Sequence, residues 1–353
     1  MPANSEKSGR VHLVGSIAMD SCEEVFQRLG EKLGPFLDRI PDGETGERSR
    51  WIYFQREMLM EHSAMEIDDT VAELELRQWD GKLLRSLPLL RFKPGVKLDS
   101  LEFETGYDEA AIKSYEIYKE MRAAGKIAEH TRFQVCLPTP MASAYMYISH
   151  KSHDDYFQVY ERSLLKALKN IRNAIPNGEL AIQYDVCQEV LLFENYFPHR
   201  PDDYKQQTFA MLGRLGNAVP ENVELGYHLC YGTPYDEHLV MPEDMSILVE
   251  LMNGISTEVK RELNFLHIPV PKNRTDEAYF APLKNSQVKE ETKMFLGLIH
   301  HDDEEGDQLR IKTASHFLKN FGIATECGWG RADPVKVPGL LDSHAHAANK
   351  LNF

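Results

Sequence analysis

The chain alternates short apolar runs with longer amphipathic stretches along almost its whole length, and this alternation restricts the folds open to it. Eight runs have the length of buried strands: residues 11–15, 39–43, 132–137, 180–184, 223–228, 263–268, 294–299 and 321–325. Segments between them have the apolar spacing or length of helices: residues 21–33, 156–172, 203–215, 242–259 and 306–320. Eight strands alternating with helices predict an α/β protein with a parallel (β/α)8 TIM barrel. A doubly wound open sheet would also alternate, so periodicity alone leaves that alternative open.

One stretch does not fit the repeat. Residues 66–106 include the run Leu87-Pro88-Leu89-Leu90 and carry no strand-helix alternation. We predict an inserted hairpin or cap there, between the second and third strands, followed by a helix over residues 108–124. Because α/β barrels of this length routinely form one domain, residues 1–353 are expected to be a single barrel domain with this insertion.

Composition and charge restrict the classes of partner that this protein can bind and the compartment in which it is expected. The chain has 40 basic and 55 acidic residues, which gives a net charge of −15 at pH 7. An acidic surface argues against a nucleic-acid or anionic-membrane partner, because phosphate binding needs clustered Lys and Arg. No apolar run approaches the ~20 residues of a membrane span, and the first ten residues lack the apolar core of a signal peptide. The five scattered cysteines favour a reducing compartment, so we expect a cytoplasmic protein. Whether it forms a homo-oligomer stays open.

Three metal-competent side chains follow two of the predicted strands. His228 and Cys230 stand at the end of one strand and Cys327 stands at the end of another. Residues two apart on a strand point the same way, so His228 and Cys230 can reach one ion. One imidazole and two thiolates suit zinc, and three protein ligands leave one position open for a reactant. The alternative is that these residues only fill the core, since free cysteine is among the most buried residue types.

Other candidate site residues, most of them polar, follow the same ends of the predicted strands. They are Gly15 and Ser16 after the first strand, Glu44 after the second, Asp185 after the fourth, His267 near the end of the sixth, and His300 and His301 at the end of the seventh. The active site of a TIM barrel is built at this carboxyl-terminal face. A single Asp after a strand is often only a helix cap, but the joint placement of these residues favours a site. His301, which precedes three acidic residues, is expected to lie in a solvated loop.

Taken together, these motifs resemble the cobalamin-independent methionine synthase family, specifically its zinc-bearing catalytic barrel, and the wider superfamily shared with uroporphyrinogen decarboxylase. The resemblance covers roughly residues 11–331 and is poor near the insertion. It implies zinc ligands, contacts to an amino-acid thiol, a group that binds the substrate's amine, and a proton donor. These roles fall on His228, Cys230 and Cys327 for zinc, on Gly15, Ser16 and Glu44 for the thiol substrate, on Asp185 for the amine, and on His300 for the proton.

The chain also departs from that family. The glutamate that serves as a zinc ligand there has no counterpart in residues 266–271, and the motif Asp-Glu-Pro is here Asp185-Val186-Cys187. Residues that would grip a folate, and the family's second barrel, are missing. For the fourth zinc position we expect water or substrate and not His267, because a strand residue one step out of register should face away.

The resemblance implies zinc-dependent transfer of an alkyl group, such as methyl, to or from a thiol. The thiol would be activated as a zinc-bound thiolate, and His300 would protonate the leaving group. The implied partners are a small-molecule thiol and an alkyl donor. Two alternatives stay open. One is a zinc-dependent lyase or hydrolase that uses a metal-activated water, and the other is a metal-free decarboxylase-like or binding barrel.

Overall fold

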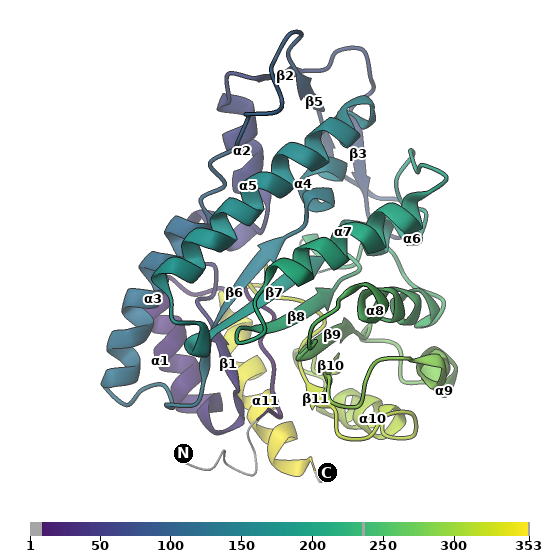
Figure 1. The fold of residues 1–353 in the computed structure, drawn as a ribbon. Coiled ribbons are helices and arrows are strands. Elements are labelled where there is room, and N and C mark those ends of the chain that lie inside the picture. The colour runs from purple at the N-terminus through teal and green to yellow at the C-terminus, as the bar shows by residue number, and fades with distance from the viewer. Residues whose placement is uncertain (1–8, 235–236, 352–353) are drawn as a thin grey trace.

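A curved parallel sheet of seven strands forms the centre of the protein. The computed structural model describes residues 9–234 and 237–351. The sheet has the order β1-β6-β7-β8-β9-β10-β11 (Figure 1). These strands are β1 (Arg39–Pro41), β6 (Arg132–Pro138), β7 (Leu180–Val186), β8 (Glu224–Leu229), β9 (Phe265–Pro269), β10 (Lys293–Gly297) and β11 (Gly322–Ile323). Their order in space follows their order in the chain, without the reversal that defines a doubly wound sheet.

The segment predicted as the first strand links the two edges of this sheet. It forms no regular strand, but Val11 makes single parallel bridges to Leu37, beside β1, and to Ile323 in β11. The backbone N–H of Val11 donates to the carbonyl of Phe36 at 3.2 Å, and that of His12 donates to Ile323 at 2.9 Å. The prediction of a regular strand over residues 11–15 is therefore wrong. The closed arrangement that results is consistent with a TIM-like barrel.

The strands are connected by helices, most of which cover the outer face of the sheet (Figure 1). They are α1 (Cys22–Leu33), α2 (Tyr53–Glu61), α3 (Tyr107–Ala123), α4 (Pro140–Tyr147), α5 (His153–Ala174), α6 (Gln188–Phe193), α7 (Tyr204–Ala218), α8 (Ser246–Glu258), α9 (Glu277–Phe280), α10 (Glu304–Ala314) and α11 (Val337–Lys350). The first begins where expected because the hydroxyl of Ser21 caps it, accepting from the N–H of Glu24 at 3.2 Å. Predicted helix 306–320 is too long, since α10 ends at Ala314. Among the described residues, no helix combines the length and the apolar character needed to cross a bilayer.

The barrel interior contains buried polar side chains as well as apolar ones. Hydrogen bonds among these polar side chains orient the carboxylate of Asp185 at the mouth of the barrel. At the amino-terminal end of the strands, Arg39 pairs with Glu224 at 2.7 Å. Higher up, His12 and the side-chain carbonyl of Gln183 lie 2.8 Å apart, and the amide of Gln183 donates to Asp185 at 2.9 Å. Buried polar groups of this kind are stable only when they are hydrogen-bonded. The network therefore holds the Asp185 carboxylate in one orientation.

Two antiparallel strand pairs lie between β1 and β6 in the chain. Strand β2 (Met65–Ile67) pairs with β5 (Leu90–Phe92), and β3 (Leu74–Arg77) pairs with β4 (Leu83–Leu87). They lie at the top of Figure 1, beyond the carboxyl ends of the barrel strands. The hydroxyl of Tyr196 donates to the carbonyl of Arg77 at 2.6 Å and so ties β3 to the segment after α6. These pairs occupy part of the stretch, residues 66–106, for which a hairpin or cap was predicted.

Candidate metal centre and its two cavities

The three predicted metal ligands meet at the mouth of the barrel. His228 lies in β8, Cys230 follows that strand, and Cys327 lies in a turn four residues past β11. The Sγ atoms of Cys230 and Cys327 are 3.4 Å apart, and Nε2 of His228 is 3.8 Å from Sγ of Cys327. All the ligand atoms lie within 4.8 Å of one another. Tetrahedral zinc, with bonds of ~2.3 Å to sulfur and ~2.1 Å to nitrogen, would separate such atoms by about 3.6–3.8 Å. The donor set and its spacing therefore fit zinc.

The two thiols of this cluster differ in acidity. The hydrogen bond from Cys230, which outweighs burial, and the charge of Arg331 lower the pKa of Cys327 well below its ordinary value. An N–H of Arg331 donates to Sγ of Cys327 at 3.1 Å. Hydrogen bonding to Cys187 and to Cys327, together with burial, raises the pKa of Cys230 well above its ordinary value. A metal bound between the two sulfurs would require both of them to be deprotonated.

His267 does not face away from the cluster, so the orientation expected from the sequence is wrong. In the parallel pairing of β8 with β9, His228 and His267 are directly opposite each other, and both side chains point into the barrel. The Nδ1 atoms of the two rings are 2.7 Å apart, and Nε2 of His267 is 2.9 Å from the carbonyl oxygen of Thr325. Burial, and then the neighbouring His228, lower the pKa of His267 well below its ordinary value. Since both of its nitrogens are engaged, His267 lies beside the ligand set and not in it.

A cavity of about 370 Å³ brings the predicted substrate residues to the same cluster. Its lining includes Gly15, Ser16, Glu44 and Asp185 together with His228, Cys230 and Cys327. A tight turn aims Glu44 into this space: Gly43 and Glu44 have φ values of 78° and 47°, in the left-handed region that glycine tolerates best. The N–H of Glu44 donates to the carboxylate of Asp42 at 2.9 Å, which stabilises the turn.

The two acids of this cavity, Glu44 and Asp185, are buried, and both have raised pKa values. Burial, and then the charge of Asp185, raise the pKa of Glu44 to about 8. Burial also raises the pKa of Asp185 to about 7, while hydrogen bonds from Gln183 and Trp51 oppose the rise. The indole N–H of Trp51 donates to Asp185 at 3.1 Å. A cation placed between these acids would lower both pKa values, so the cavity is suited to an ammonium group.

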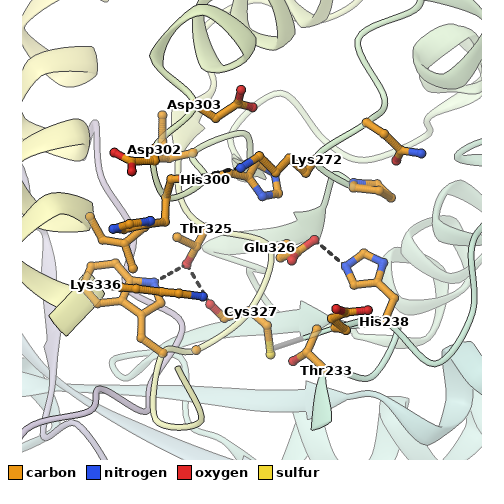
Figure 2. A pocket seen from close by; sticks show the side chains of 18 of the residues that line it. Thr233, His238, Lys272, His300, Asp302, Asp303, Thr325, Glu326, Cys327 and Lys336 are labelled. Atoms are coloured by element: carbon orange, nitrogen blue, oxygen red, sulfur yellow. Dashed lines mark hydrogen bonds and ion pairs between the residues drawn. The ribbon is translucent and has the colours of Figure 1, made fainter. Parts of the chain in front are cut away.

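A second cavity, of about 760 Å³, reaches the cluster through Cys327, Thr233 and Gly328, which line both cavities. Its wall also includes His238 and Glu326, which are hydrogen-bonded to each other. Figure 2 shows this pair, and it shows the hydrogen bond between Thr325 and the backbone of Cys327. Cys327 therefore lies on the wall that the two cavities share, while His228 and Cys230 line only the smaller one.

His300 lines this larger cavity and not the smaller one. It does not end a strand, because β10 stops at Gly297. Its Nε2 lies 3.0 Å from the carbonyl oxygen of Val270, and burial lowers its pKa to about 4. His301 lies in a turn and is partly exposed, which agrees with the expected loop, and it lines the same cavity. The strand end predicted at His300 is therefore wrong.

Two residues at the site were missed by sequence reasoning. Arg331 follows Cys327 by four residues, and a basic residue so close to a ligand cysteine is a signal that could have been noticed. Trp51 carries no such signal, since its contact with Asp185 joins residues 134 positions apart.

Solved structures of other proteins have a fold similar to that of this chain. No family model and no curated protein sequence matches the chain. Among solved structures it is similar to a B12-independent methionine synthase from Shewanella sp. W3-18-1 in complex with selenomethionine, with 15% identity, a TM-score of 0.60 and 97% of each chain covered. It is also similar to a candidate vitamin-B12-independent methionine synthase from Listeria monocytogenes, with 14% identity, a TM-score of 0.61 and 98% of each chain covered. At this identity, the likeness shows that the chain shares, over nearly its whole length, the fold of these two proteins.

Proposed function

We propose that this protein transfers an alkyl group, such as methyl, to or from the sulfur of a small-molecule thiol, with zinc held by His228, Cys230 and Cys327. The observation that carries the proposal is the convergence of these three side chains, of which Cys327 lies on the wall shared by two cavities. Zinc, when bound, would supply the means of keeping a substrate thiol deprotonated at neutral pH. The names of the two structures that share the fold refer to B12-independent methionine synthesis, which is a reaction of this kind.

The smaller cavity is proposed to hold the thiol substrate. Glu44 and Asp185 would bind its ammonium group, and the turn at Gly15 and Ser16 would contact the rest of the molecule. Trp51 would keep one oxygen of Asp185 turned toward the substrate, because its indole N–H can only donate. These fixed partners would orient the sulfur without further rearrangement of the site, which is how binding groups contribute to rate.

The larger cavity is proposed to hold the alkyl donor, with His300 as the proton donor for the leaving group. In the free protein, His300 is neutral at pH 7, and its Nε2–H is committed to Val270. The negative charge of Glu326 favours protonated His300, whereas burial, the larger effect, favours the neutral form, so a negatively charged group on the bound donor would be needed for His300 to gain its proton. The leaving group would then receive its proton from the wall of its own cavity.

The two cavities favour transfer over the other interpretations. A hydrolase or lyase needs space for one organic substrate, whereas two substrates bound at once need two spaces that meet at the reacting atoms. A metal-free barrel would give no reason for two thiols and an imidazole to converge. We further propose that residues 1–353 form one cytoplasmic barrel domain, with residues 66–106 as a cap over its mouth.

The metal content of the purified protein tests the assignment. We expect about one zinc per chain by inductively coupled plasma mass spectrometry. The double variant Cys230→Ser/Cys327→Ser should lose most of this zinc, because serine hydroxyls are poor zinc ligands. The control is Cys22→Ser, which changes a buried cysteine in α1, outside the ligand cluster, and should retain the zinc. Stoichiometric zinc in the double variant would contradict the ligand assignment.

Activity is then tested with the zinc-loaded protein. Thiols that carry an ammonium group are incubated with methyl donors, and the methylated thiol is detected by mass spectrometry. Product that requires zinc, a thiol and a donor together would support transfer. Consumption of a single substrate without added thiol would favour the lyase or hydrolase interpretation.

A further inference from the structure

The structure determines which of the two rings, His228 or His267, donates the hydrogen bond between them. His267 is fully buried, its ring centroid is 4.7 Å from that of His228, and the two Nδ1 atoms are 2.7 Å apart. Its other nitrogen, Nε2, is 2.9 Å from the carbonyl oxygen of Thr325. A carbonyl oxygen only accepts, so Nε2 of His267 must carry a hydrogen.

The hydrogen on Nε2 of His267 determines the position of the hydrogen between the two rings. A neutral imidazole has one N–H, so Nδ1 of His267 is an acceptor. The hydrogen between the two rings therefore belongs to Nδ1 of His228. This leaves the lone pair of His228 on Nε2, the atom that lies 3.8 Å from Sγ of Cys327. The tautomer set by His267 is thus the one that presents a free lone pair to the proposed metal position.

His267 also joins two parts of the site that are not neighbours in the sheet. His228 is in β8, whereas Thr325 follows β11, and β9 and β10 lie between them. Thr325 precedes Cys327 by two residues, and its hydroxyl donates to the carbonyl of Cys327 at 2.7 Å. One buried imidazole on β9 therefore touches both the histidine ligand and the segment that carries a cysteine ligand.

We propose that His267 is a positioning residue of this centre: it fixes His228 as the Nδ1–H tautomer and sets the distance between His228 and Cys327. This inference rests on the proposed metal ligands but not on alkyl transfer. Partners of this kind orient a metal-bound histidine, and their loss typically lowers metal affinity by about 10–100-fold. A residue with both nitrogens engaged elsewhere should act in this way without binding the ion.

Two substitutions separate hydrogen bonding from packing. Leucine has a volume close to that of histidine but neither donor nor acceptor, so His267→Leu should weaken zinc binding about 10–100-fold in competition with a chelator. Glutamine offers an acceptor and a donor on one side chain, so His267→Gln should recover most of the affinity. His153→Leu is the control, because it also removes a histidine that is hydrogen-bonded to a backbone carbonyl, that of Ile148, but one that packs against Tyr145 and Phe157 and not against the ligand cluster. It should bind zinc like the unchanged protein.

The tautomer is read directly, without metal, thiol or donor. Long-range proton–nitrogen NMR spectra of the zinc-free protein, with His228 assigned by substitution, should show hydrogen on Nδ1 of His228 and on Nε2 of His267. Hydrogen on Nε2 of His228 would overturn the inference, and this measurement stands even if His267→Leu does not fold. Equal zinc affinities for the leucine and glutamine variants would also overturn it. A protein that shows the tautomer and the affinity pattern but transfers no alkyl group would refute only the proposed function.

Discussion

Replacing Glu44 by glutamine should stabilise the protein, and by an amount that grows with pH. The carboxyl group is 7% exposed, and its pKa rises from an ordinary 4.5 to about 8. Between these values the unfolded chain loses the proton while the folded protein keeps it, so wild-type stability falls as pH rises toward 8. Glutamine resembles the protonated acid and has no such loss. At ~1.4 kcal/mol per pH unit, the difference is about 3 kcal/mol at pH 7 and about 5 kcal/mol above pH 8.

Coupling to Asp185 reduces the expected gain. Two interacting acids share their titration, and Asp185 can hold the proton when Glu44 ionises, so we expect roughly half of these values as the lower limit. Urea unfolding of zinc-free, reduced protein at pH 4.5, 7 and 8.5 measures the effect. Glu47→Gln is the control, since this nearby carboxylate is exposed and should change stability by less than about 0.5 kcal/mol. A gain for Glu44→Gln that is absent at pH 8.5, or equal at all three pH values, would refute a buried acid that keeps its proton.

Three further outcomes are expected. His300→Asn should lower kcat strongly and KM little, as the loss of an acid that acts on the leaving group would, whereas His301→Asn should do much less; wild-type turnover in both would remove His300 from the mechanism. Gly226→Ala should cost more than about 2 kcal/mol in urea unfolding, because its Cβ would lie 2.2 Å from the ring of Phe265; unchanged stability would show that β9 can shift. An ammonium-bearing thiol should bind more tightly as pH rises from 6 to 9 and Glu44 and its partner ionise, and calorimetry that shows no such trend would contradict the proposed ammonium site.

Local sequence patterns were enough to predict most strands of the sheet. The runs at residues 132–137, 180–184 and 223–228 correspond to β6, β7 and β8 with ends that differ by one or two residues. A buried parallel strand is a continuous apolar run, so its position is encoded by consecutive residues. The gathering of His228, Cys230 and Cys327 also followed from the sequence, because the carboxyl ends of parallel strands meet at one face.

The path of the chain beyond a strand could not be predicted in the same way. Strand β10 was expected to reach Ile299 but ends at Gly297, where the backbone of Glu326 packs so closely that a Cβ on Gly297 would lie 2.6 Å from its Cα. This approach involves a segment almost thirty residues away, and no local pattern reports it. His300 therefore leaves the sheet earlier than expected and lines the larger cavity.

The orientation of His267 shows most clearly what the sequence could predict and what it could not. The sequence places a histidine in the sixth strand, but the direction of its side chain depends on the register between β8 and β9, since a shift by one residue turns every side chain to the other face. That register is fixed by packing across the whole sheet, including the seating of Phe265 against Gly226. The sequence alone thus determined which chemical groups stand near the barrel mouth. Only the tertiary structure decided which of them touch, because contacts between strands depend on residues that are distant in the chain.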